Sequence, residues 1–378
     1  MIYKSDEKKI KIFIDCRWYS QPGQGVVTYI EGLHRAAETI LSNSGNQYGE
    51  IEFWYGVESL DELGKNLFLP KDRVIVMGRK SFVWRLLFLP IFLKKGGFKV
   101  AHFNYTCPLY KNSIKYINTV HDLLFMKHPK LFSWKHRISR SLLYSWSARK
   151  ADLILTVSEQ SRDDIKNLIH PKAPIKIIPN ASNQSVIEKT PESPKISGLQ
   201  SKNFILTVGR VEPRKNYPGL VQAFTKTNLA HQGVKLVIVG FCSDEFAKEL
   251  IEIQGKEGVH WCNRVSDGHL SWLYGNALAF VYPSMCEGFG IPVIEAIQAG
   301  LPIALSNTYP LDDVLAVAEE KFDPTDVDAI AESLRKIVTH NSSNDVARKA
   351  VERYTWANSA KQYLAAINQV LLNSGKVF

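Results

Sequence analysis

The chain has 378 residues, of which 45% are hydrophobic and 22% charged, and its formal net charge at pH 7 is +10. This composition excludes a disordered chain and supplies enough apolar residues for two domains. The five cysteines are odd in number and include no C-x-x-C pair, which argues against a disulfide framework. Residues 1–10 are polar and charged without an apolar signal segment, so we expect a cytoplasmic protein.

Apolar, β-branched segments alternate with amphipathic segments along the chain, which is typical of parallel sheets with crossover helices. Ligands of such sheets bind beyond the carboxyl ends of the strands. The strands predicted in the first half are Ile10–Asp15, Ile51–Tyr55, Val74–Met77, Val100–Phe103, Tyr116–Val120, Leu153–Val157 and Ile175–Ile178. Those predicted in the second half are Phe204–Val208, Lys235–Val239, Ala279–Tyr282 and Ile303–Leu305.

A polar segment separates the two halves. Residues 182–202 are rich in Ser, Pro, Lys and Asn and poor in apolar residues, which predicts an interdomain linker. We therefore expect an N-terminal domain over residues 1–185 and a C-terminal domain over residues 186–355. Residues 356–378 follow as a segment whose apolar spacing predicts a helix.

Two residues of the first domain follow predicted strands and are candidate ligand contacts. Gly25 lies between the first strand and a helix, where its amide can approach an anionic ligand. His121 follows the strand Tyr116–Val120 and is paired with Asp122. A lone histidine is more often structural, but its place at the carboxyl end of a strand favours ligand contact.

Basic residues are concentrated in one part of the first domain. Between Arg73 and Ala151 there are 16 Lys and Arg residues and one acidic residue, Asp122, so this segment carries +15. Apolar and aromatic residues interleave with the basic ones in residues 81–99 and 127–150, and the apolar run in the first of these is too short to span a bilayer. A basic amphipathic surface is suited to docking on anionic lipid. The alternatives are a core helix with a solvated basic face and a nucleic-acid surface, although no nucleic-acid motif is present.

Cations follow the first strand of the second domain. Arg210 and Lys215 come after Gly209 and are cations that can neutralise an anionic ligand. The alternative is that they only solvate a surface loop. Arg214 is expected to face water. Because these cations are present and no clustered Cys/His or H-E-x-x-H motif occurs, we expect no metal. The only aspartate-x-aspartate, residues 326–328, is predicted to cap a helix.

The segment from Tyr282 to Ala296 places two carboxylates, Glu287 and Glu295, on either side of a glycine turn that opens a helix. Unpaired amides at that helix start would face an anion. One carboxylate can hold a ribose diol and the other a sugar, so the pattern indicates a phosphorylated, hydroxyl-rich ligand. The alternative is an ordinary strand-turn-helix with a helix-favouring Glu295.

This segment resembles the glutamate-x7-glutamate element of the retaining family-four glycosyltransferases, which have two Rossmann-like domains facing across a cleft, the GT-B fold. Residues 208–216 resemble the second marker of that family, in which an arginine and a lysine neutralise the donor diphosphate. Further matching blocks, in the expected order, are Gly25 to Tyr29, His121-Asp122, Thr156 to Ser158 and Ile178 to Asn180. The resemblance covers roughly residues 10 to 365 and predicts an α/β, GT-B fold, with residues 356–378 crossing back to the first domain.

The resemblance also implies roles for individual residues. His121 would contact the donor sugar near the reacting carbon, Arg210 and Lys215 would neutralise the diphosphate, and Glu287 would hold hydroxyls of the transferred sugar. These four are the expected catalytic residues. The remaining expected donor contacts are Gly25, Gly209, Arg264, Val265, Gly288, Phe289, Gly290 and Glu295, with Arg264 and Val265 near the nucleotide base.

The expected reaction is retaining, metal-independent transfer of a sugar from a nucleoside-diphosphate sugar, with no cofactor and no nucleic-acid partner. Residues 119–124 are most similar to O-antigen mannosyl- and rhamnosyltransferases, which favours a GDP-mannose-like donor while uracil and thymine nucleotides stay open. The expected acceptor is a growing lipid-linked glycan in O-antigen or lipopolysaccharide biosynthesis, reached by peripheral docking on the inner face of the cell membrane. The alternatives are a transferase with a soluble acceptor, an epimerase or phosphorylase of the same fold, and a non-catalytic binding protein. The last alternative is disfavoured by the presence of four charged residues that suit the reaction, namely Arg210, Lys215, Glu287 and Glu295.

Overall fold

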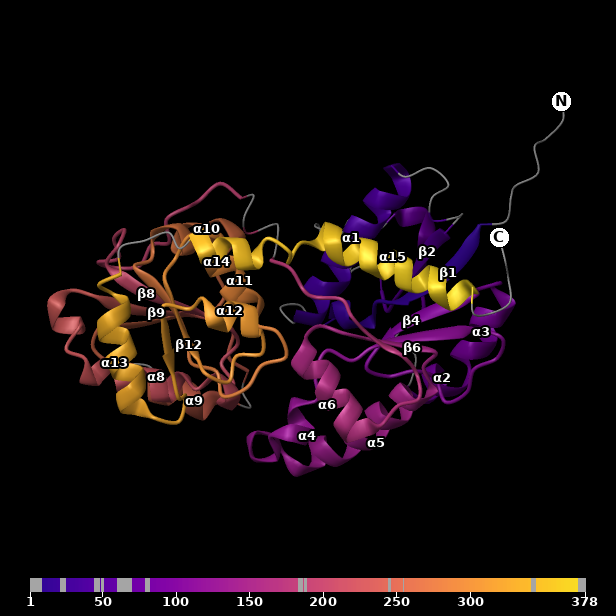
Figure 1. Cartoon of the computed structure of the whole chain (residues 1–378), viewed down its shortest axis with the longest axis horizontal. Helices are drawn as coiled ribbons and strands as arrows, with labels where there is room; N and C mark the ends of the chain where they lie inside the picture. Colours follow the sequence, from indigo (N-terminus) through magenta and orange to yellow (C-terminus); the bar gives the residue numbers. More distant parts are fainter. Residues whose placement is uncertain are drawn as a thin grey trace. The chain divides into compact units, whose positions relative to one another are not determined.

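The computed structural model describes residues 9–20, 25–43, 48, 51–59, 70–78, 82–182, 186, 189–243, 246–253, 255–340 and 345–372 (Figure 1). The contacts divide the chain into two compact units. Unit 1 comprises Met1–Ala181 and Thr355–Phe378, and unit 2 comprises Ser182–Tyr354. Residues 1–8, residues 373–378 and part of the predicted linker lie outside the described residues.

Unit 1 contains a sheet whose described strands are all parallel and have the order β3-β2-β1-β4-β5-β6-β7. Every residue of β4 and β6 is buried, as expected of strands that are covered on both faces. The strands are β1 (Ile10–Asp15), β2 (Ile51–Val57), β3 (Val74–Val76), β4 (Val100–Asn104), β5 (Lys115–Thr119), β6 (Leu153–Thr156) and β7 (Ile175–Ile177).

Helices cover both faces of this sheet. On α1, Val26, Ile30, Leu33 and Ala37 are buried at helical spacing, and the helix packs against α15. Right-handed crossovers place α1 on one face of the sheet and α5 and α6 on the other, and Figure 1 shows these layers. The helices of unit 1 are α1 (Gly25–Asn43), α2 (Phe82–Leu87), α3 (Leu89–Lys95), α4 (Leu124–Lys127), α5 (Trp134–Lys150), α6 (Glu159–Ile169) and α15 (Trp356–Leu372).

The C-terminal helix α15 is tied to unit 1 by buried polar contacts. The Ser359 hydroxyl donates to the Pro179 carbonyl at 2.7 Å, and the Tyr363 hydroxyl lies 2.8 Å from Nδ1 of His102 on β4. Because both contacts join α15 to strands or loops of the first sheet, the chain returns to unit 1 after completing unit 2.

Unit 2 contains a second parallel sheet, with the described strands in the order β10-β9-β8-β11-β12-β13. All residues of β8, β11 and β12 are buried. The strands are β8 (Phe204–Val208), β9 (Lys235–Val239), β10 (Val259–Cys262), β11 (Ala279–Tyr282), β12 (Ile303–Ser306) and β13 (Glu320–Phe322). The helices are α8 (Tyr217–Lys226), α9 (Ala247–Ile253), α10 (Asp267–Asn276), α11 (Ile291–Gln298), α12 (Asp312–Ala316), α13 (Val327–Ile337) and α14 (Asp345–Val351).

The two parallel sheets confirm the predicted α/β class with two Rossmann-like domains. All the predicted strands are present with ends shifted by at most two residues, whereas β10 and β13 were not predicted. The prediction that Asp326 caps a helix is confirmed, because its carboxylate accepts from the amides of Asp328 and Ala329 at the start of α13. Within the described ranges, no helix is both long enough and apolar enough to cross a membrane.

Candidate active site

The first part of the candidate site is the loop that follows β8 in unit 2. Gly209 has φ of +156°, and a Cβ at this position would lie 2.9 Å from the Tyr217 hydroxyl and 3.3 Å from Nζ of Lys215. A side chain at this position would clash with the Tyr217 hydroxyl and crowd Lys215, which favours glycine. The short 3₁₀ turn Pro213–Lys215 then carries two successive basic residues, Arg214 and Lys215, to the same edge of the sheet.

The second part is the loop that follows β11. Gly290 precedes the first residue of α11 with φ of +89°, in the left-handed region that favours glycine. A Cβ there would lie 2.6 Å from the ring of Tyr309, whose hydroxyl donates to the Gly290 carbonyl at 3.3 Å. The helix therefore begins at a fixed point after Glu287, and Gly288 lies between the carboxylate and the helix start.

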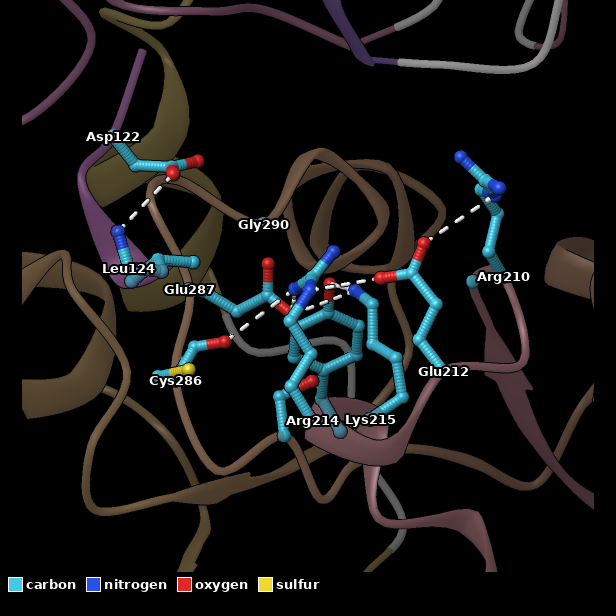
Figure 2. A network of polar contacts seen from close by, with 12 residues as sticks. Asp122, Leu124, Arg210, Glu212, Arg214, Lys215, Cys286, Glu287 and Gly290 are labelled. Carbon is cyan, nitrogen blue, oxygen red and sulfur yellow. Dashed lines mark hydrogen bonds and ion pairs between the residues drawn. The ribbon is translucent and has the colours of Figure 1, made fainter. Parts of the chain in front are cut away.

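Glu287 joins these two loops through buried ion pairs (Figure 2). Its Oε1 lies 2.6 Å from Nζ of Lys215 and 2.8 Å from Nη1 of Arg214, and its side chain is 8% exposed. Burial raises the pKa of the Glu287 carboxyl, but the charges of Arg214 and Lys215 outweigh it and lower that pKa to about 2. Glu287 is therefore ionised throughout the physiological pH range.

Lys215 is held by a second contact from β11. Its Nζ donates to the Tyr282 hydroxyl at 2.6 Å and lies 4.6 Å from the centre of the Tyr282 ring. Burial lowers the pKa of the Lys215 ammonium, and the adjacent Glu287 opposes that change. The ammonium is thus a fixed positive charge between β8 and β11.

The prediction that Arg214 faces water is wrong. Its side chain is 20% exposed, and it pairs with Glu287 on one side and with Glu212 at 2.9 Å on the other. Glu212 also lies 3.4 Å from Nε of Arg210, whose side chain is 35% exposed. Figure 2 shows that these charges form one continuous network. Lys215 is buried, Arg214 is half-buried, and Arg210 is the most accessible of the three cations.

Glu295 lies one turn into α11 and is also buried. Its Oε2 accepts a hydrogen bond from the Tyr274 hydroxyl at 2.8 Å.

Phe289, predicted as a donor contact, is 3% exposed and packs edge-on against the Tyr354 ring at 5.5 Å. If Phe289 contacts the donor, it would therefore do so through its backbone atoms and not through its ring.

The residues predicted to lie near the nucleotide base follow β10 at the same sheet edge. Arg264 is exposed, and its guanidinium lies over the Phe241 ring at 4.7 Å from the ring centre. Val265 is half-buried just before Ser266, which caps α10. The roles of both residues stay predictions.

In unit 1, His121 follows β5 and is 6% exposed. Its Nε2–H donates to Oδ1 of Asn104 at 3.1 Å, and its ring lies 4.8 Å from that of Tyr29 and 5.3 Å from that of Tyr105. Burial lowers the pKa of His121 to about 3, so the imidazole is neutral at physiological pH. Gly25, the first residue of α1, is exposed, and a Cβ there would meet no atom within 4 Å.

A buried polar pair near His121 was missed by the sequence interpretation. The Arg17 Nε lies 3.1 Å from Oδ2 of Asp15, and Nη2 donates to the carbonyls of Asn104 and Thr106, each at 3.3 Å. Between them Tyr105 has a φ of +64°, a strained conformation for a residue with a side chain. The signal that could have found this pair is two charged residues at the end of the first strand.

No group of three or more His, Cys, Asp or Glu side chains within the described part of the chain is placed to hold a metal ion. Metal independence and the absence of a cofactor stay predictions. Arg210, Arg214 and Lys215 form a cluster of positive charge at the edge of the unit 2 sheet, of the kind that can neutralise an anion.

Comparisons with known proteins find matches in both halves of the chain. Residues 189–354 match the family described as Glycosyl transferases group 1, and residues 25–184 match Glycosyltransferase Family 4. The chain is 31% identical over 266 residues to O-antigen chain mannosyltransferase B of Escherichia coli, a match that covers 66% of this chain and 69% of that protein. It is 27% identical over 289 residues to O-antigen chain mannosyltransferase RfbU of Salmonella typhimurium, covering 74% of this chain and 77% of that protein.

The fold has relatives among solved structures. Sucrose-phosphate synthase from Thermosynechococcus elongatus aligns with a TM-score of 0.74 at 18% sequence identity, covering 97% of this chain and 100% of that one. This likeness confirms the predicted fold, and the sequence matches confirm the family resemblance that the motifs carry.

The low pKa of Glu287 predicts a pH-dependent stability. Because its folded-state pKa is about 2 and its ordinary value is 4.5, ionised Glu287 stabilises the fold above pH 4.5, and this contribution is lost as the pH falls toward 2. The full difference corresponds to at most about 3 kcal/mol. Glu287→Gln should remove it, so urea unfolding followed by circular dichroism should give a lower free energy of unfolding at pH 7 and a flatter dependence below pH 4.5.

Glu332→Gln is the matched control, because Glu332 lies in the same unit and its side chain is 54% exposed. This variant should change the free energy of unfolding by less than about 1 kcal/mol. Equal pH dependence in the parent and in Glu287→Gln would show that the ion pairs of Glu287 do not stabilise unit 2.

Proposed function

Because this chain belongs to the group 1 family of glycosyltransferases, we propose that it transfers a sugar from a nucleoside-diphosphate sugar to a glycan acceptor with retention of configuration and without a metal. The observation that carries the proposal is the cluster of Lys215, Arg214 and Arg210 around Glu287, directly before the start of α11. This cluster combines fixed positive charge with a buried carboxylate, which are the groups that a sugar diphosphate needs.

The positive charges act on the leaving group. In the reaction the bond between the anomeric carbon and the diphosphate oxygen breaks, and the acceptor hydroxyl oxygen bonds to that carbon and gives up its proton to the departing diphosphate. Negative charge then grows on the departing diphosphate, where Arg210 and Lys215 would stabilise it. In comparable sites, losing one group that stabilises such a charge raises the activation free energy by about 3 kcal/mol.

The ion pairs of Glu287 support a role in holding the sugar. Its carboxylate is engaged by two cations and has a pKa of about 2, so it is a weak base and a poor nucleophile. Its remaining acceptor capacity suits neutral hydroxyls of the donor sugar. Retention of configuration would then not require a covalent intermediate on Glu287.

The donor sugar that we propose is mannose, carried by a GDP-mannose-like nucleotide. The support is the similarity to the two O-antigen chain mannosyltransferases of Escherichia coli and Salmonella typhimurium. The same similarity supports a growing lipid-linked glycan of O-antigen or lipopolysaccharide biosynthesis as the acceptor.

A lipid-linked acceptor would bring the protein to the inner face of the cell membrane. The segment from Arg73 to Ala151, with 16 basic residues and one acidic residue, supports docking on an anionic lipid surface. Lys94, Lys95 and Lys99 are exposed within this segment.

Replacing each of the two carboxylates with an amide, in separate variants, tests the donor site. Glu295→Gln should weaken nucleotide-sugar binding roughly tenfold, since it removes a charged acceptor for the ribose diol. Glu287→Gln should mainly slow transfer, by about a hundredfold. Binding is measured as protection against thermal unfolding by a panel of nucleotide-sugars, and transfer by release of the nucleoside diphosphate. With Glu332→Gln as the control, parent-like binding and turnover in both variants would overturn the site assignment.

Chelation tests the role of the cations. Transfer should persist in EDTA, because Arg210 and Lys215 take the place that a divalent ion has in metal-dependent enzymes. The rate of nucleoside diphosphate release is compared before and after chelation. Loss of activity that magnesium or manganese restores would contradict the prediction.

Charge reversal tests the docking. Replacing Lys94, Lys95 and Lys99 with Glu should reduce co-sedimentation with anionic vesicles and slow transfer to a lipid-linked acceptor, with donor binding unchanged. Each of these residues is worth about 1 kcal/mol at the membrane surface. The matched control replaces the exposed residues Lys256, Lys321 and Lys349 of unit 2 with Glu, which changes the net charge equally. Equal losses in both variants would show that only net charge matters.

A further inference from the structure

Large apolar side chains are exposed mainly in one part of unit 1. Of the fifteen exposed large hydrophobic residues in the described chain, ten lie between residues 83 and 142. We refer to these ten as the apolar face: Val83, Leu87, Phe88, Ile91, Phe92, Leu109, Tyr110, Trp134, Ile138 and Leu142. Single exposed apolar residues need no explanation, but a concentration of this kind marks an interaction surface.

The elements that carry the apolar face cover the same side of the sheet. Leu93 of α3 packs in one core cluster with Tyr116 of β5, and Tyr144 of α5 packs in another with Val120. Because side chains alternate along a strand, Tyr116 and Val120 point to the same side. The α2–α3 pair and α5 therefore lie in one helical layer.

A loop joins the two parts of this layer. The Leu109 amide donates to the Leu86 carbonyl on α2 at 2.9 Å, and the Cys107 amide donates to the Ser147 hydroxyl on α5 at 3.1 Å. Leu109 and Tyr110 are 39% and 37% exposed, so the loop contributes apolar residues between α2 and α5.

The part of the apolar face on α5 is a helical stripe. Trp134, Ile138 and Leu142 follow one another at intervals of four residues and are 64%, 57% and 70% exposed. Residues at this spacing lie on one side of a helix. Tyr144 and Ala148 on the same helix are buried in the core. The helix therefore has apolar side chains toward the protein and a second apolar stripe toward solvent.

The surrounding charge identifies the partner. Lys94, Lys95, Lys130 and Arg140 are exposed on or beside the same elements, and Asp122 is the only acidic residue between positions 73 and 151. A second copy of this chain would bring like charges together at such an interface. An anionic bilayer supplies both an apolar interior for the stripe and negative headgroups for the basic residues.

We propose that the apolar face inserts into the boundary between headgroups and acyl chains of an anionic membrane, with the α5 stripe as its leading element. The inference deepens the proposed function and rests on it for the lipid-linked acceptor. Tyr144 on α5 stacks on Tyr105 at 4.7 Å, and Tyr105 lies 5.3 Å from His121. The helix that enters the lipid thus also supports the His121 edge, where the acceptor carried by the lipid would arrive.

The test removes the stripe and keeps the charge. The triple variant Trp134→Ser, Ile138→Ser and Leu142→Ser is compared with the double variant Ile251→Ser and Val346→Ser, whose residues are 71% and 65% exposed on unit 2. With vesicles of phosphatidylglycerol and phosphatidylcholine, the triple variant should bind at least roughly tenfold more weakly, and the double variant should bind like the parent. The difference should persist in high salt, which screens the electrostatic part alone. Equal binding of the parent and the triple variant overturns the proposal.

Insertion is measured directly with vesicles whose acyl chains carry bromine, which quenches the fluorescence of a nearby tryptophan. The parent should be quenched, and Trp134→Phe should lose most of that quenching while it sediments with vesicles as the parent does. Quenching that is unchanged in Trp134→Phe, or absent in the parent, overturns insertion by α5. Sedimentation velocity without lipid tests whether the apolar face instead binds a second copy of the chain. A parent that is a dimer and a triple variant that is a monomer would overturn the proposal.

Two further measurements separate this inference from the proposed function. Protection of the parent and the triple variant by nucleotide-sugars, and transfer to a short glycan without lipid, should be equal because neither involves a membrane. If the parent shows neither protection by nucleotide-sugars nor transfer to the short glycan, but vesicle binding depends on the stripe, the proposed reaction is wrong and the membrane surface is supported. If the parent shows both activities but vesicle binding does not depend on the stripe, the proposed reaction is supported and the membrane surface is wrong.

Discussion

Removing an ammonium or a carboxylate from water costs several kcal/mol unless an opposite charge is placed close to it. In unit 2 this cost is met between Lys215 and Glu287, whose side chains are 6% and 8% exposed and whose charged atoms are 2.6 Å apart. The two residues come from the loops after β8 and β11, so neither loop can move without leaving a buried charge unpaired. The charge pair thereby fixes the edge of the sheet at which α11 begins.

The same constraint shapes the chemistry that we propose. A diphosphate that arrives at this edge meets cations already desolvated and oriented, which is the condition under which electrostatic stabilisation of a transition state is strongest. Arg210 is half-buried, and its ion pair to Glu212 is the longer one at 3.4 Å, so it can turn toward a ligand at lower cost than Lys215. In the proposed reaction Arg210 would adjust to the incoming donor, while Lys215 would both hold the two loops together and supply a fixed positive charge to the diphosphate.

The sequence predicted the features that depend on local pattern. Buried strands such as Phe204–Val208 are continuous apolar runs, and the glycine turn before α11 sets the spacing of Glu287 and Glu295. The two edge strands of unit 2 lack that signal, since β10 contains His260 and β13 contains Glu320 and Lys321. Arg214 was misjudged because its partner, Glu287, is 73 residues away, and local spacing carries no information about such a contact.

Charge is distributed unevenly along the chain, and in the structure the most basic segment also carries the exposed apolar stripe on α5. The segment from Arg73 to Ala151 carries +15 while the whole chain carries +10, so the remaining residues sum to −5. Basic charge alone would give a surface that salt can detach from a membrane. The exposed stripe on α5 would add an apolar contact that salt does not screen, and the buried side of that helix packs against the loop beside His121. Under the proposed docking, the solvent-facing side of this helix would bind the membrane and its buried side would support the His121 edge, so apolar residues would be needed on both sides.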